Sequence, residues 1–296
     1  VYGESERQEI DPDLASRTVD FIKRSVKAGK PFFAFVPLTQ PHMPTEVSKA
    51  FAGKTGHGPF ADMLAEMDAN VGRILDAVAD LKIADDTIFI FTSDNGPEDL
   101  IPHRGWAGPW TGTYVTAMEG SLRVPFIIRW PGKIPAGRVS NEMLQITDLY
   151  TTLAKVGGAE VPTDRAVDGM DQRDFLFGKS EKSARDFYPV FMPAGIGTPE
   201  LYAIKWRNYK LHLVWQERKY DVPQKLAIPR LIDLYDNPQE RIEETIGESS
   251  IETRGWVLHA MFAQFNNFQA TFAIDPPVPM GASDPYLPPK PSESRP

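Results

Sequence analysis

A carboxylate and a carboxamide stand next to each other in the run Asp94-Asn95-Gly96-Pro97. Residues 87–92, which precede them, are β-branched and aromatic and predict a strand buried on both faces. Binding sites in α/β sheets assemble at the carboxyl ends of strands, and neighbouring carboxylate and amide oxygens suit a hard cation such as calcium. The pair therefore predicts a metal site. The alternative is a simple turn, which the same four residues also favour.

A histidine follows a second apolar run. Residues 31–36 predict another buried strand, and His42 comes after it between two prolines. A histidine in this position is either a packed loop residue or a functional group, since imidazole can act as acid, base or ligand near neutral pH. The other histidines have no spacing that suggests ligation, and we expect them to be structural: His57, His212 and His259.

A third strand is expected within residues 119–132, entered through a glycine turn and left through Pro-Gly. Taken in order, the three segments resemble the sulfatases of the alkaline phosphatase superfamily, and bacterial arylsulfatases in particular. Residues 233–240, which read Asp-Leu-Tyr-Asp-Asn-Pro-Gln-Glu, are similar to a motif of the small C-terminal domain in that family. The resemblance therefore covers most of the chain.

The resemblance implies roles for three residues. The matching Asp and Asn of sulfatases bind calcium, so Asp94 and Asn95 are the expected metal ligands. The matching His contacts the sulfate ester near its leaving oxygen, so His42 is the expected catalytic residue, either as a charged donor or as an acid. Related phosphate and phosphonate hydrolases have Asp-His-Gly with a softer metal, so Asn95 favours sulfate and calcium.

One part of the family pattern is absent. Many sulfatases contact sulfate through a Lys in the motif Gly-x-Lys-Gly-x-x-x-Glu-Gly-Gly, and counting back from Glu119 puts Tyr114 near that position. His103 and Arg104, in the loop after the metal motif, are candidates for the missing positive charge, Arg104 through a bidentate grip on the anion. We therefore expect His103, Arg104 and Tyr114 to bind substrate; a solvated loop is the alternative for the His-Arg pair.

The nucleophile motif of the family is not found. Sulfatases carry Cys- or Ser-x-Pro-x-Arg, whose first residue becomes formylglycine, but this sequence has no Cys and no Ser-x-Pro-x-Arg, and it begins with Val1. We expect the chain to be the C-terminal part of a larger enzyme. The formylglycine and two further metal-binding Asp residues would lie upstream, and the chain by itself would be inactive. Its expected partner is that N-terminal part.

The resemblance implies that the intact protein is a sulfuric ester hydrolase of the arylsulfatase type, dependent on formylglycine and calcium and acting on a small-molecule sulfate ester. Two alternatives stay open. One is a phosphodiesterase or phosphonate monoester hydrolase of the same superfamily. The other is a noncatalytic remnant that never meets a nucleophile segment.

The amino-acid composition limits the classes of partner that the chain can bind. A hydrophobic fraction of 42% and a charged fraction of 24% are typical of globular chains. A net charge of -8 argues against nucleic acid or an anionic membrane as partner, so an anionic substrate must be attracted by a local cation. No apolar stretch approaches the about 18 residues of a membrane span. The absence of Cys excludes disulfides but leaves the compartment open.

Periodicity predicts the fold class. The first expected helix has its N-cap at Asp11 and Pro12 as its first residue, and it ends at Gly29. Two further helices are expected over residues 60–78 and near 141–156. They alternate with the three strands above. This alternation predicts an α/β fold with a mostly parallel sheet flanked by helices, and the resemblance implies an alkaline phosphatase-like one.

The sequence changes in character after about Asp164, where Gly, Pro and charged residues become frequent. Residues 202–206 and 210–215 predict a hairpin, and a helix is expected over 256–268. These elements predict a smaller C-terminal antiparallel subdomain.

The expected domains are the C-terminal part of the sulfatase α/β domain, a small α+β subdomain and a Pro-rich tail, at residues 1–163, 164–275 and 276–296. A parallel sheet that lacks its first strands would expose an unpaired edge. We therefore expect the isolated chain to be poorly soluble.

Overall fold

The computed structural model describes residues 3–100, 105–164, 166–193, 199–242, 251–273 and 276. The chain folds into two compact units, each of which is described by itself. Unit 1 comprises residues 1–93, 100–105 and 125–138, and unit 2 comprises residues 94–99, 106–124 and 139–296. The expected domain boundary after residue 163 remains a prediction. The expected Pro-rich tail, apart from Pro276, lies outside the described residues.

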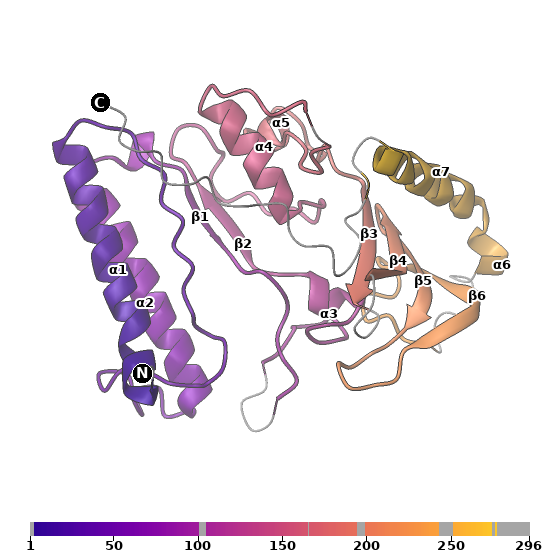
Figure 1. Ribbon diagram of the computed structural model, residues 1–296, viewed down its shortest axis with the longest axis horizontal. Helices are drawn as coiled ribbons and strands as arrows, with labels where there is room; N and C mark the ends of the chain where they lie inside the picture. Colours follow the sequence, from indigo (N-terminus) through magenta and orange to yellow (C-terminus); the bar gives the residue numbers. More distant parts are fainter. Residues whose placement is uncertain are drawn as a thin grey trace, which may run out of the picture. The chain divides into compact units, whose positions relative to one another are not determined.

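Unit 1 contains two long helices and a two-stranded sheet (Figure 1). Helices α1 (Glu4–Lys27) and α2 (Pro59–Asp80) pack side by side, and a short 3-10 helix, η1 (Ala84–Asp86), leads into β1 (Phe89–Thr92) and its partner β2 (Phe126–Arg129). Apolar side chains at helical spacing form the core between the helices: Ala15, Ile22, Ile74 and Val78. The predicted helix over 60–78 is confirmed.

The two strands of unit 1 run antiparallel, with Thr92 opposite Phe126 and Phe89 opposite Arg129. The expectation of parallel strands is wrong for this pair. A parallel pair needs a crossover, usually helical, that carries the chain back to its starting end. In the described part of the connection, residues 93–100 and 105–125, the only helix is the four-residue α3 (Glu119–Leu122), and the chain re-enters the sheet at the end where it left.

Helix α1 begins at Glu4, so the prediction of an N-cap at Asp11 is wrong. Asp11 is buried inside the helix, and its carboxylate accepts hydrogen bonds from the backbone N–H groups of Thr39 (2.9 Å) and Gln40 (2.8 Å). Asp11 therefore binds the backbone of a loop distant in sequence and does not cap the helix. Pro12 stays within the helix.

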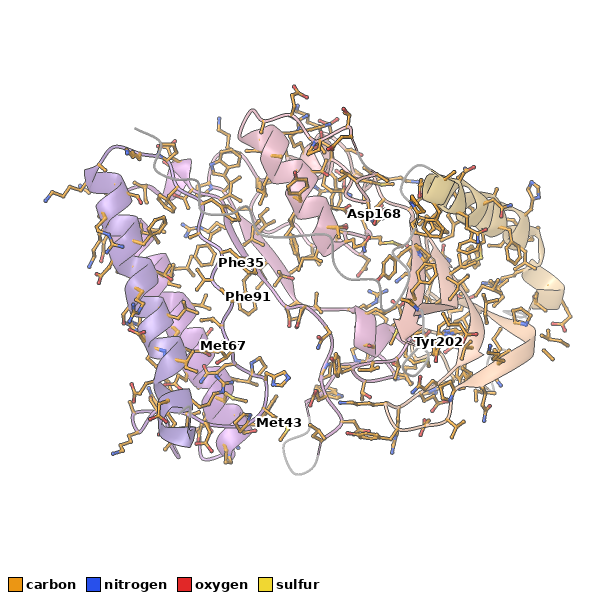
Figure 2. The ribbon with its side chains drawn as sticks, viewed as in Figure 1. Phe35, Met43, Met67, Phe91, Asp168 and Tyr202 are labelled. Carbon is orange, nitrogen blue, oxygen red and sulfur yellow. The ribbon has the colours of Figure 1, made fainter. Side chains whose placement is uncertain are left out.

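The predicted strand over residues 31–36 is wrong, because the structure assigns no strand to segment 30–39. Phe32 and Val36 pack against the helical core, whereas Phe33 and Phe35 are 75% and 78% exposed. Phe35 is labelled in Figure 2. The large side chains alternate as in a half-buried strand, although Ala34 between them is also exposed. Burial on both faces is therefore the wrong expectation for this segment.

Unit 2 holds a four-stranded antiparallel sheet in the order β3-β4-β5-β6 (Figure 1). Its strands are β3 (Phe187–Pro193), β4 (Pro199–Trp206), β5 (Tyr209–Trp215) and β6 (Gln224–Asp233). The predicted hairpin is the β4–β5 pair, whose tight connection places Arg207 at φ 55°. The antiparallel C-terminal subdomain is confirmed.

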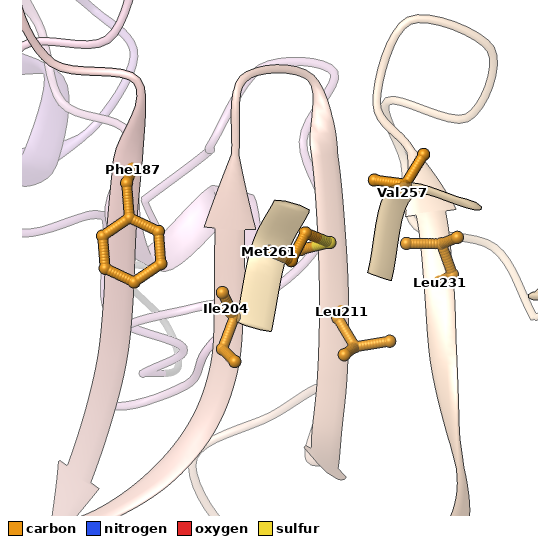
Figure 3. Close-up of a cluster of buried hydrophobic side chains, with 6 residues drawn as sticks. All are labelled: Phe187, Ile204, Leu211, Leu231, Val257 and Met261. Carbon is orange, nitrogen blue, oxygen red and sulfur yellow. The ribbon is translucent and has the colours of Figure 1, made fainter. Parts of the chain in front are cut away.

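Helix α7 (Trp256–Ala270) follows the short helix α6 (Ile251–Arg254), leads into η3 (Thr271–Ala273) and covers one face of this sheet. Figure 3 shows the buried cluster between helix and strands: Phe187, Ile204, Leu211, Leu231, Val257 and Met261. Burying one such side chain fully is worth about 1.5–3 kcal/mol, so this core stabilises the subdomain. The predicted helix over 256–268 is confirmed.

Two further helices of unit 2 are α4 (Ile146–Val156) and α5 (Arg173–Leu176). Helix α4 ends at Val156, as predicted, but begins at Ile146 rather than near residue 141. Its buried Asp148 forms an ion pair of 2.6 Å with Arg185. The structure as a whole is mixed α/β with an antiparallel subdomain, so the predicted class is confirmed. Among the described residues, no helix has the length and apolar character needed to span a bilayer.

Candidate active site

The Asp94-Asn95-Gly96 turn follows β1 directly. Asp94 is exposed, and its Oδ1 accepts a hydrogen bond of 2.9 Å from the backbone N–H of Asn95. The side-chain Nδ2 of Asn95 donates to the carbonyl of Gly96 at 3.0 Å. Because the amide nitrogen is used inside the turn, the amide oxygen is the atom that can ligate a cation. The two adjacent donor groups therefore fit a hard cation such as calcium.

Gly96 fixes this turn against helix α3. Its backbone N–H donates to the carbonyl of Ser121 at 2.8 Å, and a Cβ at residue 96 would lie 1.9 Å from the carbonyl oxygen of Gly120. The backbone N–H of Gly120 in turn donates to Thr111 at 2.7 Å. Only glycine allows so close an approach, so the glycines position the two candidate ligands.

Helix α3 is tied to the four-stranded sheet through the buried carboxylate of Glu119. Its Oε2 accepts hydrogen bonds from Lys205 on β4 (2.7 Å) and from Arg123 (2.6 Å). Its Oε1 accepts one from Lys210 on β5 at 3.1 Å. A carboxylate with no exposed surface needs such partners, because an isolated buried charge costs several kcal/mol.

Glu240 completes this arrangement. Its Oε1 accepts from Lys210 at 2.9 Å and from His212 Nε2 at 2.7 Å, and its Oε2 accepts from the backbone N–H of Glu119 at 2.6 Å. The glutamates of the two sequence motifs therefore meet through one lysine. We call this group the buried ionic cluster: Glu119, Glu240, Lys205, Lys210 and His212.

The cluster shifts the ionisation of its members. Burial alone would raise the pKa of Glu119, but the charge of Lys210 and then of Lys205 outweighs burial and holds that pKa well below its usual range. Burial also opposes ionisation of Glu240, but the charge of Lys210 and the hydrogen bond of His212 together outweigh burial, so the pKa of Glu240 is lowered. Burial lowers the pKa of His212, which favours a neutral ring that donates from Nε2 to Glu240.

Tyr114 lies beside the same turn. Its backbone N–H donates to the carbonyl of Pro97 at 2.9 Å, and the Nζ of Lys219 lies 5.1 Å from the centre of its ring. The same Nζ is 3.8 Å from a carboxylate oxygen of Glu98. Val115, next in sequence, has φ 65°, which β-branched residues rarely adopt.

His42 lies in unit 1, at an exposed position in the loop after segment 30–39. Arg7 of helix α1 donates to the carbonyls of His42 and Thr39, both at 3.0 Å, which fixes this loop on the helix. His42 Nδ1 lies 2.7 Å from the carbonyl of Met43. Because a carbonyl only accepts hydrogen bonds, Nδ1 carries the proton and Nε2 is the atom left for a substrate.

A second helix holds the same loop. Glu66 of α2 is buried, and its Oε2 accepts hydrogen bonds from the side chain of Gln40 at 2.9 Å and from the backbone of Ser48 at 3.1 Å. The candidate catalytic histidine is therefore presented by a loop that two packed helices fix. That arrangement suits a residue that must keep its orientation.

The candidates are distributed between the two units. Asp94, Asn95 and Tyr114 belong to unit 2, and the structure joins them through the 94–97 turn. The candidates His103 and Arg104 lie outside the described residues. Within the ranges that the structure describes, no three His, Asp or Glu side chains gather as a metal site. Since calcium takes six to eight oxygen ligands, Asp94 and Asn95 would supply part of that set.

Sequence reasoning did not foresee the buried ionic cluster. Lys210 and His212 occupy alternate positions of β5 beside apolar residues, so both fall on one face of the strand. Polar residues of this kind inside an apolar strand were the available signal. They indicate a buried partner of opposite charge rather than a solvated face.

Comparisons with known proteins agree with this fold. The sulfatase family matches residues 3–159, and the family described as N-sulphoglucosamine sulphohydrolase, C-terminal, matches residues 115–265. The chain belongs to the sulfatase family. The resemblance seen in its motifs is confirmed.

Curated relatives include the N-acetylgalactosamine-6-sulfatase of Sus scrofa, 41% identical over 225 residues that cover 74% of this chain and 42% of the relative. Arylsulfatase D of Homo sapiens is 35% identical over 217 residues, 71% of this chain and 35% of the relative. The chain thus spans less than half the length of these relatives.

A solved structure gives the fold. The crystal structure of the PsFucS1 sulfatase from Pseudoalteromonas sp. superposes with a TM-score of 0.83 at 28% identity, covering 94% of this chain and 56% of that chain. The alkaline phosphatase-like fold implied by the motifs is therefore confirmed.

Proposed function

We propose that the whole protein hydrolyses a sulfate ester, with aryl sulfates as the first class to test. The relatives named above are sulfatases, which supports sulfuric ester hydrolysis as the reaction type. The observation that carries the proposal for this chain is the Asp94-Asn95 turn, held at the end of β1 by the close contact of Gly96 with helix α3.

Asp94 and Asn95 are the residues proposed to hold calcium. The Asp94 carboxylate brings a full negative charge, and the Asn95 amide brings a neutral oxygen, a mixed set that calcium accepts. When bound, the cation offsets negative charge on the oxygens of the sulfate group. The chain's own contribution is orientation, because the hydrogen bonds of the turn hold both donor groups before any ligand arrives.

His42 is proposed to act at the leaving oxygen of the ester. With Nδ1 bonded to the carbonyl of Met43, Nε2 is the atom that would face the substrate. A protonated Nε2 can donate to the departing oxygen and so stabilise the negative charge that develops there. His103, Arg104 and Tyr114 are proposed to contact the sulfate group.

The nucleophile is proposed to be a formylglycine supplied by a part of the protein outside these 296 residues, because the sequence contains neither Cys nor Ser-x-Pro-x-Arg. The proposal assigns to this chain the metal ligands and the leaving-group histidine. Attack on sulfur would depend on the other part.

The test is sulfate release from 4-nitrophenyl sulfate by the whole, formylglycine-matured protein, with calcium and after its removal by a chelator. We expect activity that needs calcium and that falls about 100-fold or more in Asp94→Ala, because several kcal/mol of transition-state stabilisation depend on the cation. Asp174→Ala is the matched control, since this exposed carboxylate pairs only loosely with Lys179 at 3.6 Å. Turnover of a phosphate or phosphonate ester in place of the sulfate ester would overturn the proposal.

A further inference from the structure

We propose that Lys219, on the loop between β5 and β6, binds the sulfate group of the substrate. The proposal rests on the proposed function and adds a residue to it. The family motif places a lysine where this chain has Tyr114, and the structure brings a lysine from another element to the face of that tyrosine.

Besides the ring of its neighbour Tyr220, whose centre lies 5.6 Å from Nζ, Lys219 has two contacts with more distant residues. Its Nζ lies 3.8 Å from a carboxylate oxygen of Glu98 and 5.1 Å from the ring centre of Tyr114. Glu98 is four residues beyond Asp94, and the backbone of Tyr114 is bonded to Pro97. Both contacts therefore place the ammonium on the segment that carries the candidate metal ligands.

This segment needs a cation before it can receive an anion. Residues 94–99 contain three carboxylates and no basic residue, in a chain whose net charge is -8. A doubly charged calcium ion would offset part of that charge, and a sulfate ester adds a further negative charge. A lysine at the edge of the turn supplies a local positive charge where the substrate's anionic group must lie.

Tyr114 suits the role of a support for this lysine. Its phenol carries no positive charge, but the face of an aromatic ring attracts an ammonium within about 6 Å of the ring centre. The ring thus restricts where the flexible Lys219 side chain lies. The side chain keeps 28% of its surface exposed, which leaves the ammonium accessible to a ligand.

The loop that carries Lys219 is held in shape by its own hydrogen bonds. The side chain of Gln216, which is largely buried, donates to the carbonyls of Lys219 (3.1 Å) and Asp221 (3.2 Å). The backbone N–H of Arg218 donates to the Asp221 carboxylate at 3.0 Å. The lysine therefore projects from a fixed backbone, which reduces the entropy lost when it binds an anion.

The pairing with Glu98 leaves room for a ligand. A distance of 3.8 Å exceeds that of a charge-assisted hydrogen bond, about 2.7–2.9 Å, so the ammonium keeps hydrogen-bonding capacity. Lys225, on the neighbouring strand β6, contrasts with it, because its Nζ lies 2.7 Å from Glu200. The two lysines therefore form a matched pair for mutation, one beside the metal turn and one on the sheet.

The experiment measures kcat and KM for 4-nitrophenyl sulfate, and inhibition by inorganic sulfate, in the whole matured protein. In Lys219→Met we expect KM and the inhibition constant for sulfate each to rise about 10-fold or more, the loss of one charge-assisted hydrogen bond. Lys219→Arg should keep most of the affinity. Glu98→Gln should lower both constants, because it removes the carboxylate that competes with the substrate.

The control is Lys225→Met, which removes the same charge and should change neither constant by more than about 2-fold, since exposed ion pairs contribute little. Thermal unfolding of each variant checks that it folds. Release of sulfate by the wild type, with both constants within 2-fold in Lys219→Met, would overturn the role of Lys219 and leave the proposed function standing. A wild type that releases no sulfate would overturn both.

Discussion

The two units differ in how much of their apolar surface is buried. In unit 1, Phe33, Phe35 and Ile127 are 75%, 78% and 64% exposed. In unit 2, Ile204 and Leu211 have no exposed surface, because helix α7 covers their face of the sheet. The face of the C-terminal sheet that packs on α7 is thus buried within its own unit, whereas Ile228 on β6 is 70% exposed. In unit 1 the described residues leave a large part of the same kind of surface open.

The two units also differ in how they hold buried charge. The buried carboxylates of unit 1 accept hydrogen bonds from neutral groups: Asp11 from Thr39 and Gln40, and Glu66 from Gln40 and Ser48. In unit 2, by contrast, Glu119 and Glu240 share the ammonium of Lys210. In unit 1 the neutral donors hold individual loops. In unit 2 Lys210 joins α3 to the sheet, so the stability of that unit depends more strongly on a single side chain.

Lys210→Met should give the largest effect on stability. It leaves two buried carboxylates without a shared counter-ion, and we expect the free energy of unfolding to fall by about 3–5 kcal/mol. Urea denaturation at neutral pH measures the change. Glu66→Gln in unit 1 is the comparison and should cost about 1–2 kcal/mol, because neutral donors surround it. Equal losses in the two variants would contradict the difference between the units.

A second prediction compares the apolar faces. Leu211→Ala removes a fully buried side chain and should destabilise by about 2–5 kcal/mol. Phe35→Ala removes an exposed one and should change the free energy of unfolding by no more than about 0.5 kcal/mol. Light scattering adds a separate readout, since the open face predicts self-association of the isolated chain. Phe35→Ser should then reduce that association, and a monodisperse wild-type chain would count against it.

The third prediction concerns the loss of stability at acidic pH. Because the pKa of Glu119 lies below its ordinary 4.5 in the folded state, the unfolded chain binds a proton near pH 4.5 and the folded chain does not. Its contribution to stability is therefore present above pH 4.5 and is lost as the pH falls further, by up to about 1.4 kcal/mol per pH unit.

Lys205→Met tests this dependence. Lys205 helps to lower the pKa of Glu119, so the variant should lose less stability than the wild type between pH 4.5 and 3.5, by roughly 0.1–0.5 kcal/mol. Urea denaturation at the two pH values measures the slope. Parallel slopes would show that Lys205 does not set the ionisation of Glu119.

The sequence predicted what local patterns determine. Periodic apolar residues located helices α2 and α7, and the short polar connection located the β4–β5 hairpin. The turn after β1 was recognised from its residue types. Asp11 shows where local rules fail, because a good capping residue was bonded instead to Gln40, 29 positions away.

Contacts between residues far apart in the sequence could not be predicted from local patterns. Glu119 meets Lys205 across 86 positions and Glu240 across 121, so no sequence window contains both partners. The antiparallel pairing of β1 and β2 was not predicted for a similar reason. It depends on the segment between the two strands, most of which belongs to unit 2. Local spacing can find chemical groups, but it cannot find contacts made by tertiary packing.

The smallest expected effect is at Val115, where unit 2 holds a β-branched residue at φ 65° beside Tyr114. This left-handed conformation costs an L-residue about 1–2 kcal/mol, whereas glycine adopts it freely but loses about 0.5–1 kcal/mol in unfolded-state entropy. Val115→Gly should therefore stabilise the protein by about 0.5–1 kcal/mol in urea denaturation. Val115→Ala is the control, since it removes the branch and keeps the Cβ. If both variants destabilise equally, packing of the valine side chain outweighs its backbone strain, and the strain beside the 94–97 turn is maintained by the fold of unit 2.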